Sequence, residues 1–326
     1  MACKMHIFMD FDGTITTKDT IGILMEYIMA HDHNTYYNFW TSHCKWYAEQ
    51  CEAYEKAHCP SLAPGDLQYA DQLDLRAVID DYVNGRAKLE LESVERLNAC
   101  GIFSNTVSHE LYEAGCMGVN GGKVKIRSGF APLLDFMRRE RMSLTVLSVN
   151  WSDDWIMGCL RQWPHLAQVD LVSNHISRGA RITGPPFKIS TPDGLLLTGA
   201  NKLEAMRATQ KRIPALGDGM TFVYIGDSTT DLPCMLACDH AIVMVNEAPS
   251  PLRPNFVIDA IQAIHRCEVK NVKQSDSNFR FAWARDMIEV QEGIKILERL
   301  HREPHPAELE AQEGKSSARA APDPFI

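Results

Sequence analysis

The chain has 326 residues, of which 45% are hydrophobic and 23% charged, so it is long enough for a full core and a second, smaller unit. Its net charge of −9 and sequence pI of about 5.7 argue against nucleic acid as a main partner, because neutralising phosphates requires basic patches. No apolar run reaches the length of a membrane span, and the early acidic residues do not resemble a signal peptide. Ten cysteines at irregular spacing favour reduced thiols in a cytoplasmic protein.

Five short apolar runs predict the strands of a buried parallel sheet. They cover residues 4–10, 143–149, 169–173, 221–226 and 241–245. Near-continuous apolar sequence suits parallel strands that are covered on both faces. Helical patterns follow at residues 130–142, 153–163, 201–212 and 231–238. This alternation predicts an α/β fold, a Rossmann-like doubly wound parallel sheet.

Residues 20–118 interrupt the alternation with long helical patterns. The first helical pattern shows an amphipathic stripe whose members are spaced three and four residues apart: Tyr37, Trp40, Cys44, Tyr47, Cys51, Tyr54 and His58. A second helical pattern covers roughly residues 70–99. We expect residues 20–118 to form a helical cap inserted into the core. The turn-rich segment 178–199 is expected to form a hairpin excursion.

The remaining chain divides by composition. We expect residues 1–19 and 119–270 to form the α/β core, and residues 271–302 to form a C-terminal helix that packs on it. Residues 303–326 have little to bury and are expected to be a disordered tail.

Polar side chains follow several of the predicted strands. Asp10 and Asp12 come directly after the first strand in the sequence DFDGT, and two carboxylates so close repel each other unless a cation lies between them. Ser148 ends the second predicted strand, Asp227 follows the fourth, and Lys202 lies at a predicted helix start. Because open α/β sheets bind ligands beyond the carboxyl ends of their strands, we expect these side chains to share one site.

This set of side chains suits phosphoryl transfer. Asp10 is the candidate nucleophile, and Asp12 can give a proton to the leaving alkoxide and later take one from water. Asp227 offers a hard oxygen ligand for Mg²⁺, joined by a carboxylate oxygen of Asp10 and the carbonyl of Asp12. Ser148 would donate a hydrogen bond to a phosphoryl oxygen, and Lys202 would offset the repulsion between Asp10 and the phosphate.

Other candidate residues have a structural alternative. Asp231 is expected to support the metal, or else to cap the helix that follows it. Asp19 is expected either to contact the substrate or to cap the first helix of residues 20–118. Lys202 is preferred to Lys188 because it lies at a helix start.

The four motifs, in this order, resemble those of the haloacid dehalogenase superfamily. More narrowly they resemble its phosphoserine-phosphatase-like branch, in which a helical C1 cap follows the first motif, and they are similar to the methionine-salvage phosphatase subgroup. DFDGTIT resembles the first motif and GDSTTD the fourth, with Ser148 and Lys202 as the second and third. The resemblance covers roughly residues 1–265. It implies a Rossmann-like core, Mg²⁺ dependence and phosphomonoester hydrolysis through an aspartyl-phosphate at Asp10.

The resemblance also implies the wider site. The metal would be held by Asp10, Asp12, Asp227 and Asp231, and the phosphate and substrate would be contacted by Gly13, Thr14, Asp19, Ser148, Asn150 and Lys202. The chain departs from phosphoserine phosphatases where Val149 and Asn150 replace a glycine pair, so the Asn150 side-chain amide would replace backbone amides. Asp19 stands where those enzymes carry Glu.

The expected partner is a small phosphorylated molecule, because a cap spanning residues 20–118 would shield the site from protein surfaces. Three alternatives stay open. The first is an apolar, prenyl-type phosphate or diphosphate ester, and the second is phosphotransfer to an acceptor other than water. The third is a catalytically weak binding or stress protein on the same scaffold.

Overall fold

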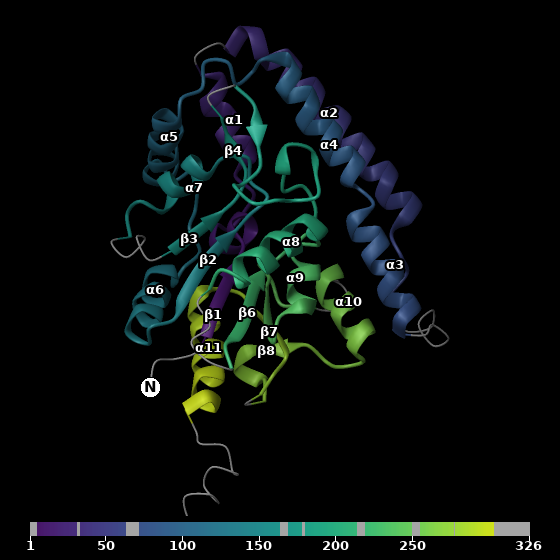
Figure 1. Ribbon diagram of the computed structural model, residues 1–326, viewed down its shortest axis with the longest axis vertical. Coiled ribbons are helices and arrows are strands. Elements are labelled where there is room, and N and C mark those ends of the chain that lie inside the picture. Colours follow the sequence, from purple (N-terminus) through teal and green to yellow (C-terminus); the bar gives the residue numbers. More distant parts are fainter. Residues whose placement is uncertain are drawn as a thin grey trace, which may run out of the picture.

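The structure, a computed structural model, describes residues 5–30, 33–62, 72–163, 169–177, 180–213, 219–249, 255–276 and 278–302 (Figure 1). The tail expected at residues 303–326 lies outside these ranges. Within them, no helix is long and apolar enough to cross a membrane. The nine cysteines of the described residues form no disulfide.

A seven-stranded sheet forms the centre of the molecule. In spatial order its strands are β3 (Val169–Val172), β2 (Ser143–Leu147), β1 (Met5–Met9), β6 (Thr221–Gly226), β7 (His240–Met244), β9 (Phe281–Ala284) and β8 (Lys270–Asn271). Every neighbouring pair is parallel. The predicted α/β class is therefore confirmed, and each of the five predicted strands is a strand of this sheet.

Helices cover both faces of the sheet. Along β1, Ile7 and Met9 join one apolar cluster, whereas Phe8 joins another, because alternate side chains of a strand point to opposite faces. The first cluster contains α6 (Phe130–Arg139), α7 (Asp153–Leu160) and α11 (Met287–Arg302). The second contains α8 (Gly199–Gln210), α9 (Leu232–Ala237) and α10 (Phe256–His265). Burial on both sides explains why the strand sequences are almost continuously apolar.

The segment that interrupts the sheet is helical, as predicted. It contains α1 (Ile21–Met29), α2 (His33–His58), α3 (Gln72–Asn84), α4 (Ala87–Cys100) and α5 (Ser108–Asn120). The amphipathic stripe lies on α2, which runs beside α4 (Figure 1). The run expected over 70–99 is two helices, interrupted at Gly85.

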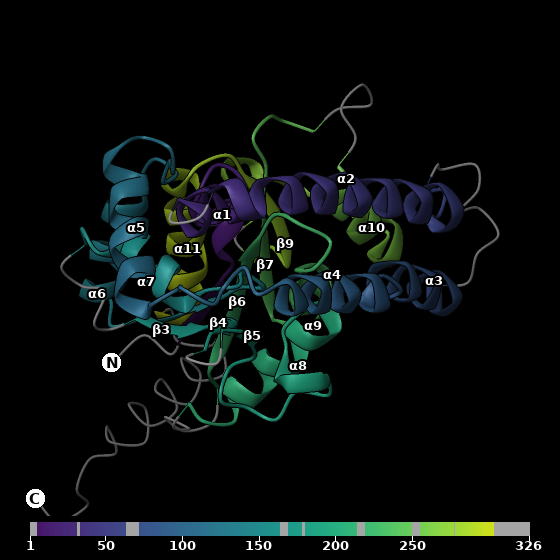
Figure 2. The same ribbon diagram turned by 90° about the horizontal axis from the view of Figure 1, so that it is seen from above.

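The two ends of this segment pack on the sheet layers. α5 lies along α7, and its residues Leu111 and Ala114 belong to the same apolar cluster as Ile7. At the other end α3 packs against α10, where the rings of Tyr82 and Phe256 are 5.1 Å apart. Figure 2 shows α2 lying across the top of the molecule from α1 toward α3. The division into core and cap stays a prediction, although α5 packs as a core helix.

Two local expectations need correction. Residues 271–302 contribute more than a helix, because β9 lies between β7 and β8 within the main sheet before α11 begins. The hairpin expected at 178–199 occurs earlier, as the antiparallel pair β4 (His175–Ile176) and β5 (Ile182–Thr183). Such short strands bury too few apolar residues to give a periodic signal.

Candidate active site

Three side chains of the predicted site follow neighbouring strands at one edge of the sheet. β1 lies between β2 and β6, and Asp10, Ser148 and Asp227 follow these three strands. The Asp10 amide donates to the Ile225 carbonyl of β6 at 2.9 Å, which fixes Asp10 at the strand end. Asp10 and Ser148 are buried, and Asp227 is half-buried. The parallel sheet therefore brings together residues that are far apart in sequence.

The first motif forms a tight turn over Phe11–Ile15, and this turn lies close to the Asp227 side chain. Gly13 has a φ of 76°, in the left-handed region, and a β-carbon at this position would lie 2.2 Å from Asp227 Oδ2. The Thr14 hydroxyl donates to Asp227 Oδ1 at 3.0 Å. Glycine thus meets both the backbone conformation and the close approach of the carboxylate. Phosphate contacts from Gly13 and Thr14 stay predictions.

Lys202 is carried to the site by the first turn of α8. Thr198 and Asn201 form a capping box at this helix start. The Lys202 ammonium, which is fully buried, donates to Asp10 Oδ1 at 2.5 Å and to Asp231 Oδ1 at 2.6 Å. Burial alone would lower the pKa of Lys202, but the two carboxylates raise it above its usual value, so the side chain is charged.

The Asp231 carboxylate is surrounded by protein donors. Its Oδ1 accepts from Lys202 and from the Tyr224 hydroxyl, the latter at 2.7 Å. Its Oδ2 accepts from the amides of Asp227 and Ser228 and from the Ser228 hydroxyl, each at 3.0 Å. Burial raises the pKa of Asp231, but these donors, Lys202 first, bring it below its usual value. Asp231 precedes α9 without a side-chain capping bond, and it holds the loop after β6 instead.

Asp10, Asp227 and Asp231 form a carboxylate group suited to a hard cation. One oxygen from each lies within 4.8 Å of the other two. In an octahedral Mg²⁺ site with metal–oxygen distances of about 2.1 Å, adjacent ligand oxygens are about 3 Å apart and opposite ones about 4.2 Å. The upper limit of 4.8 Å between the three carboxylate oxygens is close to these distances. Because protein donors already surround Asp231, Asp10 and Asp227 are the better-placed direct ligands, and Asp231 would hold them in position.

Negative charge in this group exceeds what Lys202 offsets. Burial raises the pKa of Asp10 well above its usual range, and Lys202 opposes this effect while Asp231 and Asp227 add to it. Burial, followed by repulsion from Asp231, raises the pKa of Asp227 to about 7. A divalent cation between these carboxylates would favour their ionised forms. The donor chemistry and the charge both fit Mg²⁺.

The Asp12 carboxylate has different partners. Its Oδ1 accepts from the Thr20 amide at 2.8 Å, and its Oδ2 accepts from the Asn150 side-chain nitrogen at 2.6 Å. Thr20 is itself held by Trp155, whose indole N–H donates to the Thr20 hydroxyl at 3.0 Å. Burial, followed by repulsion from Asp19, raises the pKa of Asp12 to about 7. A carboxyl group with such a pKa can both give and take a proton near neutral pH.

These contacts separate the Asp12 carboxylate from the other three acids of the expected metal set. The Asp12 carboxylate is not one of the three grouped carboxylates, so its side chain is not placed as a metal ligand. A contact from the Asp12 carbonyl stays a prediction. The difference arises because the chain turns over Phe11–Ile15, so the two-residue repeat of the strand, which would place Asp10 and Asp12 on one side, ends before Asp12.

The second motif folds into a turn after β2. Ser148 Oγ accepts from the Asn150 amide at 3.1 Å, and Asn150 Oδ1 accepts from the Ser152 amide at 3.1 Å. The Asn150 side-chain nitrogen, expected on phosphate, donates to Asp12 in this structure. Asn150 is therefore placed to orient Asp12. A phosphate contact from Ser148 stays a prediction.

Asp19 has the structural role considered for it, and its contact with a substrate stays a prediction. Its Oδ1 accepts from the Ile21 amide at 2.9 Å, which stabilises the first turn of α1. The same residue lines a cleft of about 750 Å³ together with residues of α1 and α2. The structural role and a role beside a substrate are compatible here.

Comparison with known proteins finds relatives of low sequence identity. No protein-family model matches the chain. A CTO1 family protein of Schizosaccharomyces pombe is 26% identical over 249 residues, covering 74% of this chain and 81% of that protein. Cold tolerance protein 1 of Saccharomyces cerevisiae is 24% identical over 282 residues, covering 82% of this chain and 87% of that protein.

The similarity of the chain to solved structures is weak in both sequence and fold. A substrate-bound phosphoserine phosphatase complex has a TM-score of 0.42 and 12% identity, covering 78% of this chain and 90% of that one. Cytosolic 5′-nucleotidase IIIB bound to cytidine has a TM-score of 0.47 and 14% identity, covering 92% of this chain and 88% of that one. Within this chain itself, the four motifs meet at the carboxyl edge of a doubly wound parallel sheet, and a helical insertion follows the first motif. This arrangement is similar to that of the haloacid dehalogenase superfamily.

Arg127 also contacts the first motif, although no sequence motif singles it out. Its buried guanidinium donates to the carbonyls of Gly13, Thr14 at 2.9 Å and Arg285 at 2.8 Å, and to the Asn246 side chain at 3.2 Å. One arginine thus ties the first motif to the loops after β7 and β9. The sequence carries no signal for this role, because an isolated arginine is most often exposed.

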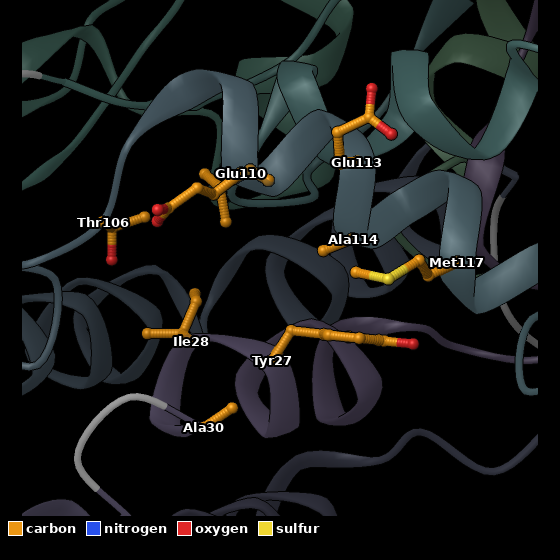
Figure 3. Close-up of a pocket in the computed structure, with 9 residues that line it drawn as sticks. Tyr27, Ile28, Ala30, Thr106, Glu110, Glu113, Ala114 and Met117 are labelled. Carbon is orange, nitrogen blue, oxygen red and sulfur yellow. The ribbon is translucent and has the colours of Figure 1, made fainter.

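Two cavities lie near these elements. Asp227 and Gly13 line a cleft of about 340 Å³ together with Arg127, which gives access to the carboxylate group. A second cavity, of about 310 Å³, lies between α1 and α5, where Tyr27 lies across from Met117 (Figure 3). None of the predicted site residues lines this second cavity.

Proposed function

We propose that the protein is a Mg²⁺-dependent phosphatase that hydrolyses a small-molecule phosphate monoester through an aspartyl-phosphate at Asp10. The observation that carries this proposal is the contrast between two acids on one turn. Asp10 lies with Lys202, Asp227 and Asp231, whereas Asp12 is held by other donors and has a pKa of about 7. This contrast supports a role for Asp10 in binding a cation and attacking phosphorus, and a role for Asp12 in proton transfer.

The residues support two successive displacements. An Asp10 carboxylate oxygen forms a bond to phosphorus while the ester P–O bond breaks, and the leaving oxygen takes the proton of Asp12. The Asp12 carboxylate then takes a proton from water as the water oxygen attacks phosphorus. The Asp10–phosphorus bond breaks, and inorganic phosphate and free Asp10 result.

Charge balance explains the remaining residues. When bound by Asp10 and Asp227, Mg²⁺ would supply positive charge to the phosphoryl oxygens. Lys202 stays charged beside Asp10 and limits its repulsion of an incoming dianion. Ser148 lies at the end of β2, from where its hydroxyl would donate to a phosphoryl oxygen. A cytoplasmic location is also part of this proposal.

The test is a phosphate-release assay with Mg²⁺ over a panel of phosphate esters. Asp10→Asn should lower kcat by about 10⁴-fold or more, the order expected when a nucleophile is removed. Asp170→Asn is the matched control, because Asp170 is exposed on β3. Turnover retained by Asp10→Asn would count against covalent catalysis. A wild-type protein that binds esters but never hydrolyses them would instead support a binding protein on this scaffold.

A further inference from the structure

The segment that carries Arg127 runs antiparallel to the chain that leaves the first motif. Thr16 and Ile126 form an isolated antiparallel bridge, and the Arg127 amide donates to the Ile15 carbonyl at 2.8 Å. These contacts bring the Arg127 side chain against the turn over Phe11–Ile15, where it is 5% exposed. The chain thus returns to the first motif directly after the helical insertion.

The Arg127 guanidinium holds two consecutive carbonyls of this turn. Its Nε donates to the Thr14 carbonyl at 2.9 Å, and its Nη2 donates to the Gly13 carbonyl. These two nitrogens form one edge of the planar guanidinium, so both carbonyls are fixed in a single geometry. Because a peptide unit is planar, fixing a carbonyl also fixes the direction of the amide that follows it. A lysine ammonium has no such rigid fork of donors.

The other edge of the guanidinium binds a fixed part of the core. Its Nη1 donates to the Arg285 carbonyl at 2.8 Å and to the Asn246 side chain at 3.2 Å. The Arg285 amide donates to the carboxylate of Glu289, which is buried in the first turn of α11 and also accepts from the Asn271 side chain. Arg127 thereby ties the first-motif turn to the start of α11.

The turn held by Arg127 contacts Asp227, one of the two proposed direct ligands of the cation. The Thr14 hydroxyl donates to Asp227 Oδ1 at 3.0 Å, and Arg127 holds the carbonyl of the same threonine. Gly13 lies so close that a β-carbon there would be 2.2 Å from Asp227 Oδ2. A shift of this turn would therefore move the hydroxyl that orients the carboxylate, or push on the carboxylate itself.

The charge of Arg127 does not explain its position. All four of its acceptors are uncharged, namely three carbonyls and the Asn246 side-chain oxygen. Burial costs a charged group free energy, and it lowers the pKa of Arg127 although Asp227 and Asp286 oppose this effect. Arg127 also lines the same cleft as Asp227, where a positive charge repels a cation. What Arg127 supplies is a rigid fork of donors.

We propose that Arg127 is a positioning residue for the cation site. It holds the turn at Gly13 and Thr14, so that the Thr14 hydroxyl keeps the Asp227 carboxylate in the orientation that binds Mg²⁺, and it acts without contacting cation or substrate. This inference rests on the proposed function for the identity of the cation, whereas the contacts that carry it belong to the protein alone.

The test is calorimetric titration of Mg²⁺ into wild type, Arg127→Met and the control Arg138→Met, since Arg138 is exposed on α6. Charge and position predict opposite results. Loss of a nearby positive charge should by itself tighten Mg²⁺ binding, whereas loss of a residue that orients a ligand weakens it by about 10–100-fold. We expect Arg127→Met, folded by circular dichroism, to bind Mg²⁺ about 10-fold or more weakly, and the control to bind it as wild type does.

Two further variants separate positioning from charge and from stability. Arg127→Lys keeps the charge and loses the fork, so it should also weaken Mg²⁺ binding by about 10-fold or more, and it decides the matter if Arg127→Met does not fold. Thr14→Val removes the hydroxyl that joins the turn to Asp227. Its effect on Mg²⁺ affinity should not add to that of an Arg127 variant in the double variant, because both act through one contact.

Mg²⁺ binding that is unchanged or tighter in Arg127→Met would overturn the inference, as would unchanged binding in Arg127→Lys or effects of Arg127 and Thr14 variants that simply add. If wild type binds Mg²⁺ and hydrolyses no ester, the proposed function fails, while the same titrations still decide the role of Arg127. Absence of Mg²⁺ binding by wild type would overturn both.

Discussion

Replacing Lys202 by methionine tests the electrostatic centre of the site without metal or substrate. The ammonium lies 2.5 Å from Asp10 Oδ1 and 2.6 Å from Asp231 Oδ1, and all three side chains are at most 6% exposed. Methionine keeps similar length but removes the charge. Two buried carboxylates then lose their shared cation and repel each other.

The expected cost follows from this burial. Removing one partner of a buried ion pair costs about 3–5 kcal/mol, because the remaining charge is uncompensated. With a urea m-value of about 3 kcal/mol/M, a loss of about 4 kcal/mol lowers the unfolding midpoint by about 1.3 M. Without Lys202 the folded pKa of Asp10 lies further above its unfolded value of 3.8. The folded state then holds a proton that the unfolded state releases, so the variant should lose stability as pH rises above 3.8.

The assay is urea unfolding followed by circular dichroism at pH 5 and pH 8, in EDTA. Lys188→Met is the control, because Lys188 is exposed and its loss should cost about 0.5 kcal/mol or less. Adding Asp10→Asn to Lys202→Met should restore part of the stability, since it removes one of the uncompensated carboxylates. A cost below about 1 kcal/mol at both pH values, equal to that of the control, would refute the electrostatic reasoning.

Other perturbations probe separate parts of the molecule. Gly13→Ala should destabilise the fold by about 1–3 kcal/mol, because the added β-carbon would lie 2.2 Å from Asp227 Oδ2. It should also weaken Mg²⁺ binding measured by calorimetry. Unchanged Mg²⁺ affinity and unchanged stability would contradict this prediction. Burial lowers the folded pKa of His6 to about 4 from an unfolded 6.5, so stability is complete above pH 6.5 and up to about 3 kcal/mol is lost as pH falls to 4. His6→Gln should flatten the stability–pH curve in that window, and an equally steep curve would show that another group is responsible. Asp12→Asn should lower kcat by about 10²–10⁴-fold and keep Mg²⁺ affinity, since that carboxylate is outside the metal group; lost Mg²⁺ binding would make Asp12 a ligand.

Much of the core could be predicted from local sequence because the strands are buried on both faces. The runs that became β1, β2, β3, β6 and β7 are apolar at nearly every position, and this pattern needs no knowledge of their neighbours. The sequence did not reveal β8 and β9 because they are only 2 and 4 residues long, too short to give a periodic signal. The break between α3 and α4 was missed for a similar reason, since both helices share one periodicity.

The candidate site divides in the same way. Chain order alone implied that Asp10, Lys202 and Asp227 meet, because parallel strands and the helices between them present these positions at one edge. The sequence pattern does not say in which direction each side chain points. The side-chain directions in the structure show that Asn150 donates to Asp12 and that the Asp12 carboxylate lies outside the group of three carboxylates. They also show that donors surround Asp231.

The sequence by itself determined the parallel sheet, the helical insertion and the identity of the acids and the lysine at the sheet edge, since these depend on residue type and spacing. Only the tertiary structure decided how those groups share charge, that Arg127 binds the carbonyls of the first motif, and that residues of α1 and α2 line one cleft. The physical reason is that burial and contact are set by segments distant in sequence, so no local pattern contains them.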